Sequence, residues 1–168
     1  MGKLAKFPNK SEREDFFRQL RDLLPEKLPI NPDDLDIRYP GGNWIVLKYL
    51  LYPSAQYELQ FSTIHSEQHT AIFGEGDHEV LAFYYGGSRI EKRRAWLQTI
   101  EPYIASVRSQ LGKKVFHGGW GKNKDWAFIA VDLIEDDLGF DVDRYACAIV
   151  EFIETTHDPI SKAFHAII

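Results

Sequence analysis

Basic residues gather in the middle of the chain, where they could bind an anion. Residues 88–124 carry nine Lys/Arg against two Asp/Glu, a net charge of +7, although the whole chain has a charge of −5. Surface cations bind phosphate, and aromatic rings between them can stack on unpaired bases. Glycines in the same segment would let backbone approach a ligand closely. The candidate nucleic-acid- or phosphate-binding residues are Arg89, Lys92, Arg93, Arg94, Lys113, Lys114, Trp120, Lys122 and Lys124.

The same residues have a second interpretation, as a solvated helix face and a flexible hairpin tip. Cations at a helix N-terminus oppose the helix dipole unless an anion or an acidic neighbour compensates. Residues 125–168 carry ten Asp/Glu against two Lys/Arg, a net charge of −8. This acidic segment could neutralise the basic one within the fold, so both interpretations stay open.

A metal site is the weaker alternative, on His65, Glu67 and His69. If this stretch were extended, the two-residue period of a strand would put all three side chains on one side. Two imidazoles and a carboxylate suit Zn²⁺ or Fe²⁺. Alternatively, the segment is a polar turn between two strands that binds nothing.

Two further alternatives concern a nuclease and an interaction module. Asp33 and Glu58 loosely match the acidic residues of metal-dependent nucleases, but Gln60 stands where a cation would be needed. An open sheet face rich in aromatic side chains would instead bind a partner protein or a second copy of the chain, making a homodimer. The aromatic residues considered for such a face are Tyr49, Tyr52, Tyr57, Phe61, Tyr84 and Tyr85.

Other enzymatic signatures are missing from the sequence. It contains no Gly-x-Ser-x-Gly, no Walker-type phosphate loop and no dinucleotide fingerprint. The one cysteine, Cys147, lies in an apolar stretch and is expected to be a small core residue. We therefore expect a binding domain rather than an enzyme, with no cofactor.

The elements that must position these residues follow from periodicity and turn signals. A capping-box pattern at residues 11–14 starts a helix that Pro25 should end. Strand patterns follow at 35–39, 44–52, 57–64, 70–73 and 80–85, joined by short turns typical of hairpins. A second capping-box pattern at 88–91 starts a long helix over 88–111, which Pro102 should kink. Strands at 113–116 and 126–133 and a helix from Asp141 to a break at Pro159 complete the chain.

This order predicts an α+β fold: a two-layer sandwich with a mostly antiparallel sheet of about six strands and the helices on one face. The length of 168 residues suits a single domain, with residues 1–10 as a flexible arm. The sequence has neither a secretory signal nor an apolar run long enough for a membrane span, so we expect a cytoplasmic protein.

The second half of the chain resembles a known family. Residues 79–168 run through a strand (80–85), a helix ending at Leu111 and Gly112, strands at 115–120 and 126–131, and a helix with spaced aromatics. This pattern is similar to a bacterial family of domains of unknown function found beside restriction-modification or nuclease modules. The resemblance implies an accessory role near enzymes that act on nucleic acid, and it assigns no catalytic residues. Together with the basic segment, it predicts a non-enzymatic accessory domain that binds nucleic acid or a phosphate ligand in a bacterial defence or restriction context.

Overall fold

The protein folds as an antiparallel sheet covered by helices, as seen in a computed structural model that describes residues 9–52, 54–62, 67–86, 89–120 and 126–167. The strands are β1 (Leu35–Arg38), β2 (Trp44–Tyr49), β3 (Ala55–Ser62), β4 (His78–Tyr85), β5 (Phe116–Trp120) and β6 (Trp126–Asp132). Within the described residues they form one sheet of order β1-β2-β3-β4-β6-β5, and every neighbouring pair is antiparallel. The α+β class and the antiparallel sheet predicted from the sequence are confirmed.

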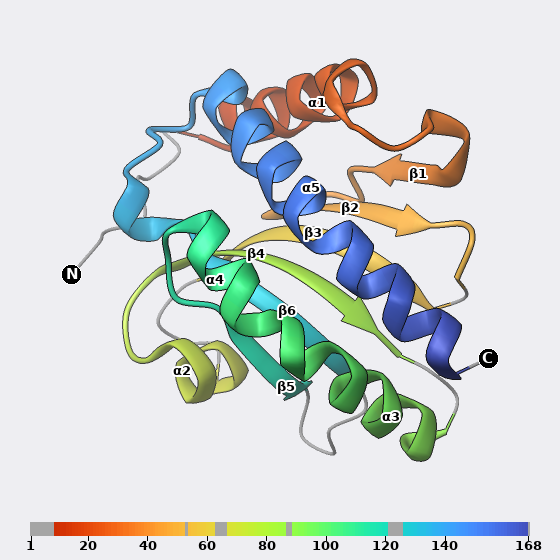
Figure 1. The fold of residues 1–168 in the computed structure, drawn as a ribbon. Coiled ribbons are helices and arrows are strands. Elements are labelled where there is room, and N and C mark those ends of the chain that lie inside the picture. The colour runs from red at the N-terminus through yellow and green to blue at the C-terminus, as the bar shows by residue number, and fades with distance from the viewer. Residues whose placement is uncertain (1–8, 53, 63–66, 87–88, 121–125, 168) are drawn as a thin grey trace.

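The helices are α1 (Lys10–Lys27), α2 (Glu67–Phe73), α3 (Ile90–Ile100), α4 (Ile104–Leu111) and α5 (Val142–Ile167), with short 3₁₀ turns η1 (Pro32–Asp34), η2 (Glu101–Tyr103) and η3 (Ile134–Asp136). In Figure 1, α5 crosses the middle of the sheet, α1 lies beside it near β1, and α3 and α4 follow one another over β5 and β6. Pro102 lies in η2 and separates α3 from α4, which confirms the predicted interruption of the long helix. In the described residues, no helix is both long enough and apolar enough to cross a membrane.

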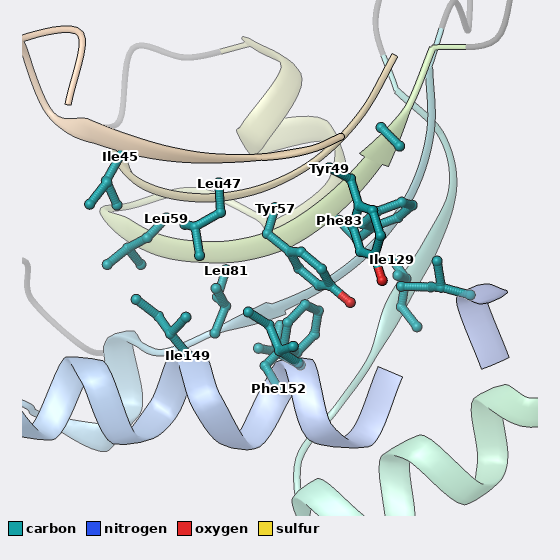
Figure 2. Packing of buried hydrophobic residues seen from close by; sticks show 14 of the residues in the cluster. Ile45, Leu47, Tyr49, Tyr57, Leu59, Leu81, Phe83, Ile129, Ile149 and Phe152 are labelled. Atoms are coloured by element: carbon teal, nitrogen blue, oxygen red, sulfur yellow. The ribbon is translucent and has the colours of Figure 1, made fainter. Parts of the chain in front are cut away.

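The main core lies between the sheet and these helices. Alternate residues of the strands point toward α5, where Ile149 and Phe152 meet them, as Figure 2 shows. The buried side chains on the sheet side include Ile45, Leu47, Tyr49, Tyr57, Leu59, Leu81, Phe83 and Ile129. Polar links cross the same layer. The hydroxyls of Tyr57 and Thr156 lie 3.1 Å apart, and the Tyr49 hydroxyl lies 2.6 Å from Nδ1 of His157.

A smaller apolar cluster lies on the opposite face of the sheet. It is formed by Val80, Ala82, Tyr84, Phe128 and Ala130, and α2 contributes Ile72 and Phe73 to it. One helix therefore departs from the predicted arrangement, in which the helices lie on one face. The predicted strand at 70–73 is wrong: this segment is part of α2, because β3 and β6 already pair with both edges of β4.

Several local predictions are corrected by the structure. The side chain of Asn9, rather than Ser11, caps α1 by accepting from the Glu12 amide at 2.9 Å. Pro25 lies inside α1 and Pro159 lies inside α5, so neither ends its helix. The turns beyond Pro159 continue because they bury Ile160, Ala163 and Phe164, and this packing offsets the lost backbone hydrogen bond.

Glu79 is a buried carboxyl group that links the sheet to α5. It accepts a hydrogen bond from the Tyr145 hydroxyl, and only 3% of its surface is exposed. Burial raises the pKa of Glu79 to about 7, and the charge of Asp132 adds to this effect. Between pH 4.5, the ordinary pKa of a glutamate, and about pH 7, the folded protein therefore holds a proton that the unfolded chain has lost.

We predict that Glu79→Gln stabilises the protein in alkali but not in acid. The stability that comes from holding the proton is complete below pH 4.5 and is lost as the pH rises through 7. Above that pH the variant has no charged side chain to bury. Its free energy of unfolding should therefore exceed that of the wild type by about 2 kcal/mol, a value that allows for solvent screening. Urea unfolding at acid and alkaline pH measures this, with exposed Glu151→Gln as the control. An equal effect at both pH values would contradict it.

Candidate functional site

The start of α3 and the β5–β6 hairpin enclose a groove of about 350 Å³. One face of α3 lines it, because residues at positions i, i+3, i+4 and i+7 lie on the same side of a helix. Two of these residues are apolar, Ile90 and Leu97, and two are cationic, Arg93 and Arg94. Gly119 of β5 and Trp126 and Ala127 of β6 form the other wall. We call this the α3 groove.

Apolar surface is accessible at the α3 groove. Ile90 is 37% exposed, which makes it one of the most exposed large hydrophobic side chains in the described chain. Trp126 is partly exposed, while it also packs against the small cluster on the far face of the sheet. The exposed apolar side chain at the groove is therefore that of Ile90, next to two arginines of the same helix face.

The position of Trp126 is fixed by a close packing contact. A Cβ atom added to Gly86 would come within 2.6–2.8 Å of three atoms of the six-membered ring of Trp126. Real Cβ contacts are not this short, so the bare Cα of Gly86 is what allows the indole to lie here. Gly86 follows β4, which pairs with β6, so the contact is one between neighbouring strands.

Positive charge surrounds the α3 groove. Arg94, Lys92 and Arg89 are exposed, and Arg93 is partly exposed. Arg93 is close enough to Tyr85 to act on it: burial raises the pKa of Tyr85, and the Arg93 charge lowers it. Arg89 is the N-cap residue of α3 but makes no side-chain cap, and the predicted capping residue Ser88 lies outside the described residues. The helix thus begins with an accumulation of positive charge that an anion would relieve.

The structure divides the basic residues that the sequence placed together. Lys113 and Lys114 follow the C-terminus of α4, with all of α3, η2 and α4 between them and Ile90. Lys113 forms an ion pair with Asp136, and the ammonium of Lys114 lies 4.7 Å from the centroid of the Phe116 ring. The backbone of Trp120 pairs with Trp126, although its side chain lies outside the described part, as do Lys122 and Lys124.

A second cleft, of about 510 Å³, lies beside Lys113, and its lining includes five carboxylates. His78 lies in its wall with both ring nitrogens occupied: Nδ1 is 2.7 Å from Asp132 Oδ2, and Nε2 is 2.7 Å from the Gly74 carbonyl. The other oxygen of Asp132 accepts from the amides of Glu79 and Ile134, each at 3.0 Å. These contacts tie the start of β4 to the end of β6, and His78 has no nitrogen left for a metal or a substrate.

The alternative metal and nuclease sites gain no support from the described residues. His65 lies outside them, and Glu67 and His69 lie in α2, so these two residues do not have the extended conformation that the site requires. Among the described residues no group of three His, Cys, Asp or Glu could hold a metal ion. For the nuclease, Glu58 lies level with Arg38 at the far end of β1, whereas Asp33 precedes that strand.

The aromatic residues considered for an open sheet face are mostly in the helix-covered core. Tyr49, Tyr57, Phe61 and Tyr85 are buried there, and Tyr52 packs against that core from its edge. Tyr84 alone of the six belongs to the cluster on the opposite face, where it is also buried. The expected binding face of exposed aromatics is therefore not formed by these six residues.

The α3 groove also contains residues that the sequence analysis did not select. Ile90 and Leu97 share the helical spacing of Arg93 and Arg94, so this signal was present in the sequence. Trp126 could not be found in this way, because it is 33 positions from Arg93 and only strand pairing brings it near. No protein-family model, curated protein or solved structure matches the chain.

We predict that Gly86→Ala forces Trp126 out of its position. The added methyl overlaps the indole, so we expect a loss of about 1–3 kcal/mol in the free energy of unfolding. Denaturant unfolding measures the loss, and the same substitution in a Trp126→Leu background is the control. There the methyl has room, so most of the loss should disappear; an unchanged loss would show that Trp126 is not the obstacle.

Proposed function

We propose that this chain is a non-enzymatic domain that binds nucleic acid or a phosphate ligand at the α3 groove. The observation that supports this is the groove itself, which is lined by Arg93 and Arg94 from one face of α3. Guanidinium groups pair with phosphate in a bidentate fashion, and Arg is preferred wherever phosphate is recognised. The N-terminal end of α3 adds backbone amides with positive partial charge.

The charge distribution supports the same proposal. Arg89 and Lys92 at the start of the same helix are exposed, so they add positive charge near the groove for a phosphate backbone. Asp136 of the acidic C-terminal segment forms an ion pair with Lys113. That lysine follows α4, so this carboxylate does not neutralise the start of α3. An accessory role beside a restriction or defence enzyme, implied by the family resemblance, is part of this proposal.

We predict that Arg93→Glu/Arg94→Glu abolishes binding of labelled oligonucleotides at low salt. Two phosphate contacts are lost and two repulsive charges are gained, so affinity should fall at least a hundredfold. Removing the charges alone, with Arg93→Gln/Arg94→Gln, should lower the slope of log K against log salt by about two. Fluorescence anisotropy over a salt series measures both.

The matched control is Arg108→Glu, which reverses an exposed charge on α4, the helix beyond the Pro102 break. Because Arg108 does not line the groove, this change should leave binding within about twofold at moderate salt. The proposal fails if the wild type does not bind at low ionic strength, or if charge reversal at Arg93 and Arg94 changes affinity no more than reversal at Arg108.

A further inference from the structure

The edge of the sheet formed by β1 has unused main-chain hydrogen-bonding groups. The amide of Leu50 donates to the carbonyl of Asp34 at 2.9 Å, and these two residues continue the register of the β1–β2 pair. Main-chain groups of an antiparallel strand alternate in direction, so every second residue of β1 faces β2, and Ile37 faces away from it. Ile37 therefore presents both its amide and its carbonyl at the edge, and within the described residues no hydrogen bond satisfies either.

Apolar surface lies next to this edge. A groove of about 380 Å³ lies between α1 and β1, and its lining includes Leu35 and Ile37 of β1 and Pro25 of α1. An added strand would pair with the main chain of Ile37 and place apolar side chains on the face where this groove lies, because side chains alternate between the two faces of a sheet. β1 ends the strand order on one side and β5 ends it on the other (Figure 1).

The charges of β1 indicate which strand would fit. Asp36 and Arg38 form an ion pair on the face opposite Ile37, and their side chains are 33% and 67% exposed. An antiparallel strand paired around Ile37 places one residue opposite each of them, and opposite charges attract across two strands. The complement is therefore an acidic, an apolar and a basic residue in that order. Residues 36–38 of this chain have this order themselves.

We propose that the β1 edge pairs with the β1 edge of a second copy of this chain, about a two-fold axis at Ile37. In this register Ile37 exchanges two main-chain hydrogen bonds with the partner's Ile37. Asp36 lies opposite the partner's Arg38, and the same contact repeats on the other side of the axis. The partner's Ile37 side chain lies beside Ile37 on the face of the groove, and the two sheets continue as one antiparallel sheet.

Other registers of the same edge are less favourable. An axis at Asp36 places Asp36 opposite the partner's Asp36, and like charges directly across two strands repel. An axis at Leu35 needs the Leu35 amide, which already donates to the Pro32 carbonyl. Charged residues on an edge strand commonly prevent pairing. Here the two charges have opposite signs and meet their complements when the axis is at Ile37, so they select that register.

We predict that the wild type forms dimers in sedimentation equilibrium in reducing buffer, at concentrations from about 10 µM to about 1 mM, the range of a weak interface. Asp36→Arg and Arg38→Asp each place like charges opposite one another at both contacts. Each should therefore lower the association constant at least about tenfold. An equimolar mixture of the two variants should restore association, because each variant then meets the charge opposite to its own. Restoration also shows that both variants fold.

The matched control is Arg108→Asp, which makes the same change of charge as Arg38→Asp at an exposed position of α4. This substitution lies outside β1, so it should leave the association constant within about twofold.

Amide hydrogen exchange measures the pairing at the main chain itself. The Ile37 amide should exchange more slowly as the protein concentration rises, in proportion to the fraction of monomer that remains. The amides of Asp36 and Arg38 face β2, so their exchange should not depend on concentration, and they are the internal control.

Three results would overturn the inference: no dimer at about 1 mM, a dimer that both charge variants leave unchanged, or a mixture of the variants that stays monomeric. A synthetic peptide of residues 33–40 that binds a chain that is itself monomeric would also overturn it, because the edge would then take a strand of another protein. The inference does not rest on the proposed function. The α3 groove lies beside β5 and β6, at the other edge of the sheet, so oligonucleotide binding is a separate measurement.

Discussion

Burial of β4 on both faces is the constraint on which the rest of the structure depends. All eight of its residues are buried, and both its edges are paired, with β3 on one side and β6 on the other. A strand without a solvent-facing side requires a layer on each face. Helices α3, α4 and α5 pack on one face and α2 on the other. The α3 groove lies where the first turns of α3 meet β5 and β6.

Much of this fold could be predicted from local pattern. In β3, which has one face in the core, buried and half-buried residues alternate from Ala55 to Phe61, and Pro102 lies at the break between α3 and α4. The errors came where tertiary packing prevails over local signals. Ile72 and Phe73 have strand-forming character, yet no edge of β4 was open to receive them. Pro159 is tolerated because buried Phe164 holds the helix beyond it, and a sequence window does not show what a later turn will contact.

The candidate site could be predicted in part. The cationic start of α3 was evident from composition, and its orientation was encoded in the spacing of Ile90, Arg93 and Leu97. The sequence could not separate these cations from Lys113 and Lys114. The two groups are close in the chain, but helices extend between them and put them apart in space. Nor could the sequence show where Trp126 lies, because its position depends on sheet register and on the absence of a side chain at Gly86.

Cys147 was expected in the core, but it is exposed on α5 beside the end of α1. The helical stripe that enters the core passes through Tyr145, Ala146 and Ile149 and leaves position 147 outward. Because the chain has no other cysteine, oxidation of this thiol can join only two separate molecules. A covalent dimer formed in air would then reflect thiol chemistry rather than association, so the oligomeric state has to be measured under reducing conditions.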